Sequence, residues 1–307
     1  MGENSETTTI TDNLIQPFQM AEAGVRGRIV RLGDALDTIL KRHDYPERVA
    51  HLLGEGLVLA TILGGALKFD GIFTVQTKGD GAIGMLAADL TTPGNLRGYA
   101  AYNEEMLAQA EASTEASLVK RFFGTGYAAF TIDSADTGQR YQGIVDLEGG
   151  SLQDCMENYF TRSEQLETKL FVSVEKVDGN WRGGGLMIQR LPEESLAELK
   201  QDQAEEGWRN AEALASTVTP EELTHPHLRA PELLYRLFHE DGVWLYDVSE
   251  LQDKCSCSAE RVMSTLTSFS DDNLEEMADE GAIGVDCQFC STHYSFTVDD
   301  VKAAKSA

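Results

Sequence analysis

The sequence is short of basic residues. Its 307 residues contain 25 Lys and Arg against 51 Asp and Glu, so the formal net charge is -26. Proteins grip nucleic-acid phosphates, and approach anionic membrane surfaces, through clustered Lys and Arg. We therefore expect neither nucleic acid nor a membrane as a partner. Strong acidity instead favours solubility, even for a protein that must expose apolar side chains.

The sequence also lacks a long apolar run and a secretory signal core. The longest mostly apolar stretch, Gly56 to Leu67, is too short to span a bilayer and is typical of a buried helix. Residues 1–9 are polar, and we expect them to form a disordered tail rather than a signal peptide. These features predict a cytoplasmic protein, and the cytosol keeps thiols reduced.

Alternating apolar residues and turn residues predict a domain over residues 10–190. The expected strands, several joined by Asp-Gly turns, are 25–32, 72–77, 82–88, 126–133, 139–146, 168–176 and 184–190. Helical spacing is expected over 46–69 and over 151–166, which begins with a Ser cap. The glycines of 46–69 suggest either close packing of a helix on a sheet or a break between two helices. Hairpins mixed with helices indicate an α+β fold with a mostly antiparallel sheet.

The composition changes after Pro192. Acidic residues dominate 193–222, where Lys200 and Arg209 are the basic ones and apolar coverage is thin. Such a pattern predicts marginal acidic helices that bridge two bodies. We therefore assign residues 191–235 to an acidic helical linker and residues 236–307 to a small C-terminal module.

Four of the five cysteines lie in that module. Cys255 and Cys257 form a CxC pair, Cys287 and Cys290 form a CxxC pair, and 29 residues separate the two pairs. Zinc prefers four ligands in a tetrahedron, and thiolate is a preferred donor. The intervening segment has caps for two short helices, one from Ser258 and one from Asp271 or Asp272, which would return the second pair to the first. The pattern predicts one zinc ion per chain held by the four cysteines.

Three alternatives remain open from the residues alone. The CxxC pair could serve a thiol–disulfide oxidoreductase, although Cys290 is followed by a predicted strand rather than the helix of a thioredoxin-like site. His293 could replace one cysteine ligand. The zinc could be purely structural, in a partner-binding protein. Cysteine spacing alone favours a structural zinc over a redox switch, although the oxidation of thiolates would permit such a switch. Cys155 lies in a predicted helix, and we expect it to behave as a small apolar residue.

Other motifs carry weaker signals. Residues 79–84 fit GxGxxG, but their Asp-Gly step predicts a hairpin rather than the helix start of a dinucleotide site. Gly183–Gly185 lacks the Lys-Ser/Thr of a phosphate loop, and we expect a flexible turn there. His225 and His227 are expected to be solvated loop residues. No arrangement typical of catalysis stands out.

The chain resembles the 33 kDa chaperonin family, the redox-regulated heat shock protein 33 of bacteria. The resemblance covers nearly the whole length and rests on the cysteine pairs together with several segments. These are Leu52-Leu53-Gly54-Glu55, Leu67-Lys68-Phe69, Lys78-Gly79-Asp80-Gly81, Arg97-Gly98-Tyr99, Gln142-Gly143-Ile144-Val145 and Tyr159-Phe160-Thr161-Arg162-Ser163-Glu164-Gln165-Leu166.

The resemblance implies a stress-activated holdase chaperone that uses no ATP and is not an enzyme. The reduced form would bind zinc through Cys255, Cys257, Cys287 and Cys290 and be inactive. Oxidation would form the disulfides Cys255–Cys257 and Cys287–Cys290, release zinc, and unfold the module and the linker. The active form would bind unfolding client proteins and dimerise. Residues 1–9 extend beyond the usual start of the family.

Overall fold

The computed structural model describes residues 12–192, 201–240 and 242–305. The chain divides into two compact units, Met1–Asp253 and Lys254–Ala307, which we call the large unit and the cysteine unit. The expected tail at residues 1–9 lies outside the described residues. The segment limits predicted above remain predictions. The structure places its own division after Asp253, because short strands between residues 244 and 253 pair with strands of the large unit.

The large unit contains two sheets. Sheet A has the strand order β10–β1–β2–β9–β8, and β11 also pairs with β1. Its pairs are antiparallel, and β2 covers the residues predicted from the alternation. The strands are β1 (Leu14–Met20), β2 (Val25–Leu32), β8 (Thr168–Val177), β9 (Asn180–Arg190), β10 (Trp244–Leu245) and β11 (Ser249–Glu250).

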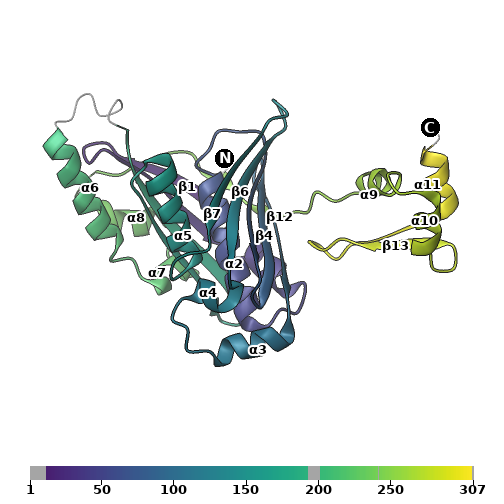
Figure 1. The fold of residues 1–307 in the computed structure, drawn as a ribbon. Helices are drawn as coiled ribbons and strands as arrows, with labels where there is room; N and C mark the ends of the chain where they lie inside the picture. Colours follow the sequence, from purple (N-terminus) through teal and green to yellow (C-terminus); the bar gives the residue numbers. More distant parts are fainter. Residues whose placement is uncertain (1–11, 193–200, 241, 306–307) are drawn as a thin grey trace, which may run out of the picture. The chain divides into compact units, whose positions relative to one another are not determined.

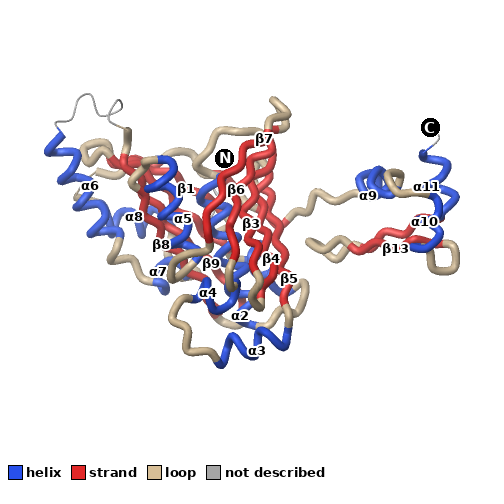
Figure 2. The backbone as a smooth tube through the Cα atoms, in the orientation of Figure 1, coloured by secondary structure: helices blue, strands red, loops and turns tan. Residues whose placement is uncertain are grey.

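Sheet B has the strand order β12–β5–β4–β3–β6–β7 (Figure 2). All its pairs are antiparallel except that of β12 with β5. The strands are β3 (Gly71–Gly79), β4 (Ile83–Thr91), β5 (Asn95–Tyr102), β6 (Gly126–Ser134), β7 (Arg140–Asp146) and β12 (Gln252–Asp253). The turn after Gly79 joins β3 to β4, so the predicted hairpin is confirmed and the GxGxxG match opens no helix.

Helix α2 (Glu47–Gly64) packs between the two sheets and contacts strands of both. Two of its glycines show how closely the sheets approach. A Cβ on Gly54 would meet Val174 of sheet A at 2.8 Å, and one on Gly56 would meet Leu86 of sheet B at 2.6 Å. The prediction that these glycines serve close helix–sheet packing is confirmed. The large unit also contains α1 (Asp34–Lys41), α3 (Glu104–Ala112), α4 (Leu118–Phe123), α5 (Leu152–Tyr159) and the π-helix η1 (Phe160–Glu164).

The opposite face of sheet A is covered by α6 (Gln201–Ala215), α7 (Pro220–Thr224) and α8 (Ala230–Phe238), which we call the linker helices (Figure 1). They form a second apolar core with the sheet, in which Phe18 stacks on Phe238 with ring centroids 5.7 Å apart. The described part of the acidic segment, residues 201–222, is therefore largely helical, as predicted, but its apolar face is more continuous than expected. The buried apolar residues of the linker helices are Ala204, Trp208, Ala211, Ala215, Leu223, Ala230, Leu233, Leu234, Leu237 and Phe238.

The turn predicted at Gly183–Gly185 is wrong, because these residues lie inside β9. A Cβ on Gly185 would meet Val58 of α2 at 2.7 Å, and one on Gly184 would meet the carbonyl oxygen of Leu223 at 2.1 Å. Glycine is needed here because α2 and the linker helices approach the same strand from its two faces.

The cysteine unit consists of α9 (Ala259–Leu266), α10 (Asp271–Met277), the hairpin β13 (Ala282–Asp286) and β14 (His293–Thr297), and α11 (Val298–Lys305). The side chains of Ser258 and Ser270 accept hydrogen bonds from the first turns of α9 and α10, as the predicted caps require. Among its described residues the fully buried apolar core is small: Leu266, Leu274, Ile283 and Val301. An apolar core of this size rarely holds a domain together without a metal or disulfides.

Candidate metal centre

The four predicted cysteine ligands come together in the cysteine unit. Cys255 and Cys257 lie on the extended segment that leads into α9, and Arg261 of that helix donates a hydrogen bond of 2.9 Å to the carbonyl of Ser256. This bond fixes the CxC segment against the helix that follows it.

The CxxC pair occupies the turn between β13 and β14. The amide of Cys287 donates to the carbonyl of Thr292 at 3.0 Å, and the amide of Ser291 donates to the carbonyl of Cys287 at 2.7 Å. Ser291 has a φ of 58°, in the left-handed region. The turn therefore closes tightly and presents both thiols to the CxC segment.

The sulfur geometry suits a metal ion. All four Sγ atoms lie within 4.8 Å of one another. The Sγ of Cys257 lies 3.3 Å from that of Cys290, and the Sγ of Cys255 lies 3.8 Å from that of Cys287. Tetrahedral zinc with Zn–S bonds of about 2.3 Å places its sulfurs about 3.8 Å apart. The donor set, its number and its spacing thus fit a tetrahedral thiolate site.

The electrostatics of the cluster also point to a cation. Burial raises the pKa of Cys257 to about 12 and raises the pKa of Cys287 as well. Burial acts in the same direction on Cys290, but hydrogen bonds from Thr292 and from neighbouring thiols outweigh it and lower the pKa of Cys290 to about 6. Burial thus opposes the thiolate form at Cys257 and Cys287. Four thiolates at this separation require a positive ion among them.

Two side chains near the sulfurs were not foreseen. The Oγ1 of Thr292 lies 3.1 Å from the Sγ of Cys290, and the hydroxyl of Tyr294 donates a hydrogen bond of 3.1 Å to the Sγ of Cys257. That bond raises the pKa of Tyr294 to about 12. Thr292 directly precedes β14, and Tyr294 lies two residues further along, so this two-residue spacing is the signal that could have identified them.

The alternative ligand and the lone cysteine both lie apart from the cluster. His293 alternates with Tyr294 along β14, and its Nδ1 pairs with Asp286 at 2.7 Å. Cys155 is fully buried in the core beside α2, and burial raises the pKa of its thiol to about 11. His225 accepts hydrogen bonds from the amides of His227 and Leu228, a local turn contact. In the described ranges the grouping that could hold a metal is the one formed by the four cysteines.

The described helices include none long and apolar enough to cross a membrane.

Comparisons with known proteins agree on one family. The family model described as Hsp33 protein matches residues 13–297. The chain is 38% identical over 299 residues to a 33 kDa chaperonin of Caulobacter vibrioides (strain NA1000 / CB15N), covering 96% of this chain and 98% of the relative. It is 40% identical over 288 residues to a 33 kDa chaperonin of Ectopseudomonas mendocina (strain ymp), covering 93% and 92%.

The fold is also similar to that of a solved structure. The crystal structure of the 33 kDa chaperonin (heat shock protein 33 homolog) of Thermotoga maritima superimposes with a TM-score of 0.77, covering 96% of this chain and 98% of that one, at 22% sequence identity.

Proposed function

Because this chain belongs to the Hsp33 family of chaperones, we propose that it is a redox-regulated holdase that binds unfolding proteins without ATP. The chain is a chaperone rather than an enzyme. The observation that carries the redox part of the proposal is the convergence of four thiols within 4.8 Å of one another. The proposed site of action is the cytoplasm, where such thiols stay reduced until an oxidant appears.

In the reduced state we propose that Cys255, Cys257, Cys287 and Cys290 hold one zinc ion. Bound zinc would supply the positive charge that four thiolates require and would join the CxC segment to the β13–β14 turn. Structural zinc contributes on the order of 10–16 kcal/mol of apparent binding free energy. The small core of the cysteine unit makes its folding depend on that contribution.

Oxidation would act on the ligands themselves. Each pair of thiolates gives up two electrons and forms one S–S bond, while hypochlorous acid is reduced to chloride and water. The proposed pairs are Cys255–Cys257 and Cys287–Cys290, as the family resemblance implies. A CxC disulfide is strained and therefore easily reduced again. Loss of the thiolates frees the metal, and the cysteine unit unfolds.

The linker helices cover the surface that activation would expose. They cover one face of sheet A, where Phe18, Ile29, Leu186 and Ile188 are buried beneath them. In the described residues, three basic side chains of the sheet attach the linker helices and the turn after α7. Arg31 donates to the carbonyls of Glu222 and His225, Arg182 donates to the carbonyl of Thr224 at 2.7 Å, and Lys169 pairs with Glu212 at 3.0 Å. Outward acidic residues keep the released segment soluble. We propose that unfolding clients bind the uncovered apolar face, and that the oxidised chain forms a homodimer.

One titration tests the proposal. Zinc-loaded reduced protein is treated with increasing hypochlorous acid, and zinc release, disulfide mapping and suppression of client aggregation are measured on the same samples. We expect zinc release and suppression to rise together, with neighbouring cysteines linked. If zinc stays bound while thiols outside the cluster oxidise, the zinc is purely structural and the redox switch is rejected. Equal suppression by reduced and oxidised protein would reject the redox switch, and insulin reduction without zinc would favour a thiol–disulfide oxidoreductase at Cys287 and Cys290.

A further inference from the structure

An apolar cavity of about 200 Å³ opens in the large unit, beside the C-terminal end of α2. Its walls come from both sheets, from α2 and from the π-helix η1. The apolar lining includes Leu63, Phe73, Phe130, Phe160, Leu166 and Met187. An engineered apolar cavity of about 150 Å³ stays dry and binds benzene, so this cavity has room for one aromatic ring.

A cation lies in this apolar lining. Arg26 of β2 lines the cavity, and its Nε donates to the Oε1 of Gln189 at 2.9 Å. Gln189 is 4% exposed, and its amide nitrogen in turn donates to Thr168 at 2.9 Å. The buried amide therefore holds the guanidinium in a fixed direction through two donors, and the other N–H donors of Arg26 make no hydrogen bond within the described residues.

The charge of Arg26 is not neutralised by the part of the chain that the structure describes. Its hydrogen bonds there go to a neutral amide, and no carboxylate forms an ion pair with it. A second guanidinium, Arg28, lies two residues away on the same strand face and binds the carbonyl of Gly65 at the end of α2. In a chain with a net charge of -26, two neighbouring arginines that form no ion pair with a carboxylate of the described residues favour an external anion.

Another part of the cavity wall is built from an uncommon element. The π-helix η1 places Phe160 and Glu164 in the lining, and π-helical turns occur often at functional sites. The hydroxyls of Tyr159 and Tyr141 both donate to Glu164, at 2.7 and 3.1 Å. These bonds hold the carboxylate of Glu164 at the tyrosine side of the cavity, where it forms no ion pair with Arg26.

We propose that this cavity binds a small amphipathic carboxylate, with an aromatic ring or branched alkyl group in the apolar part and the carboxylate on Arg26. Guanidinium binds carboxylate through paired N–H donors, which suits the fixed orientation of Arg26. The ligand chemistry has two sources: a free aryl-alkanoate, or the terminal residue of a polypeptide that ends in an aromatic side chain. The inference does not depend on the redox switch, because every lining residue belongs to the large unit.

The probe is 3-phenylpropionate added to the full-length reduced protein, followed by the methyl NMR signal of Met187. We expect a saturable shift with a dissociation constant on the order of micromolar to millimolar. The uncharged 3-phenylpropionamide should bind at least tenfold more weakly, because it cannot form the charged contact. Equal binding of acid and amide, or no shift of the Met187 signal, would overturn the proposal without any variant.

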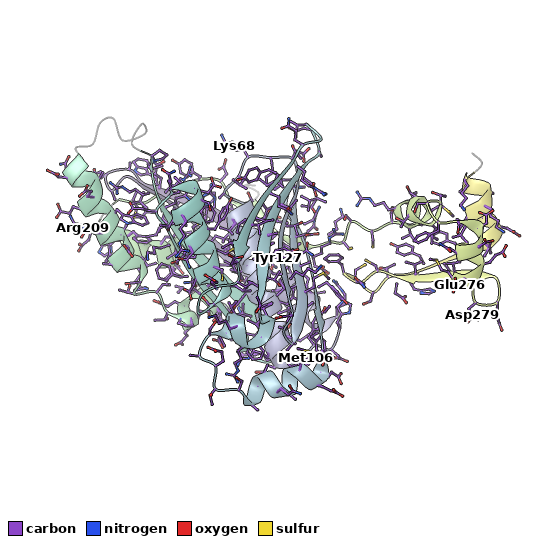
Figure 3. All side chains as sticks on the ribbon, in the orientation of Figure 1. Lys68, Met106, Tyr127, Arg209, Glu276 and Asp279 are labelled. Atoms are coloured by element: carbon purple, nitrogen blue, oxygen red, sulfur yellow. The ribbon has the colours of Figure 1, made fainter. Side chains whose placement is uncertain are left out.

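Two variants localise the contact. Arg26→Gln should lower the affinity for 3-phenylpropionate at least tenfold, whereas Arg209→Gln, on the exposed face of α6 (Figure 3), should leave it unchanged. An equal loss in both would show a general charge effect and reject the site. A peptide that ends in Phe, compared with its C-terminal amide, separates the two sources. Tighter binding of the peptide acid than of 3-phenylpropionate assigns chain ends, and weaker binding assigns free carboxylates.

Discussion

Trp208→Ala tests whether docking of the linker helices keeps the reduced chaperone inactive. Trp208 lies in α6, is 6% exposed, and belongs to the apolar core between the linker helices and sheet A. Replacing a buried aromatic residue with alanine costs about 3–5 kcal/mol. The loss falls on docking, because the core around α2 is a separate cluster that does not include Trp208. The undocked fraction should therefore increase roughly 150- to 5,000-fold.

The assay uses reduced, zinc-loaded protein. Suppression of client aggregation should appear without oxidant, and amide hydrogen exchange should accelerate in α6 and on Leu186 and Ile188. Zinc content should stay at one per chain, because the cysteines lie in the other unit. Arg209→Ala changes the neighbouring, exposed residue and should alter none of these readouts. Faster exchange in α6 without any gain of aggregation suppression would refute the idea that the covered face is the client surface.

Three further predictions follow from the same structure. Replacing Cys287 and Cys290 with serine should abolish tight zinc binding and unfold the cysteine unit, and unchanged zinc stoichiometry would contradict the ligand assignment. Tyr294→Phe removes the hydrogen bond to Cys257 and should weaken zinc binding about 10- to 100-fold in a chelator competition. The control His293→Ala, on the other strand face, should change zinc binding little. Equal effects of the two substitutions would reject the role of Tyr294. Burial raises the pKa of Glu55 to about 7, so its contribution to stability is present below its unfolded pKa near 4.5 and is lost as the pH rises through 7. Glu55→Gln should therefore stabilise the large unit by about 3 kcal/mol at pH 8 and by almost nothing at pH 4, as read from denaturant unfolding, and a pH-independent difference would contradict the assigned cause.

Several elements could be predicted because local chemistry determines them. Alternation gave β2, and the Asp-Gly and Asp178-Gly179-Asn180 turns gave the β3–β4 and β8–β9 hairpins. Ser151 caps α5 with a full capping box, as its position suggested. The helix expected over 151–166 is α-helical only as far as Tyr159. The chain then continues as the π-helix η1 to Glu164.

Other elements depend on long-range partners that no local pattern reports. Strand β1 contains Pro17, which argues against a strand interior. Proline is accommodated because Pro17 lies between the short pairings of β10 and β11, where the ladder is interrupted and no N–H donor is required. Its carbonyl accepts a hydrogen bond from the amide of Tyr246. Those strands have two residues each and leave no periodic signal.

The candidate metal centre likewise has a part that the sequence predicts and a part that depends on the fold. Cysteine spacing identified the four thiols, because a CxC and a CxxC leave few ways to converge on one ion. The contacts from Thr292 and Tyr294 required the register of β14 against the CxC segment, which spacing does not contain. The sequence shows the apolar residues of the linker helices, but it does not show which surface they pack against. The structure shows that this surface is the chain's own sheet A.

The pairing of β1 with β10 and β11 has a consequence for how the chain is made. Residues 14–19 pair with residues 244–250 along one edge of β1, while the other edge pairs with the neighbouring β2. The first edge therefore stays open until almost the whole large unit has left the ribosome. The same stretch then supplies β12 to the edge of sheet B, beside Asn95 and Leu96. During synthesis both sheets therefore keep open edges, and such edges favour aggregation. This member of a chaperone family would itself be exposed to aggregation until residue 253 has been translated.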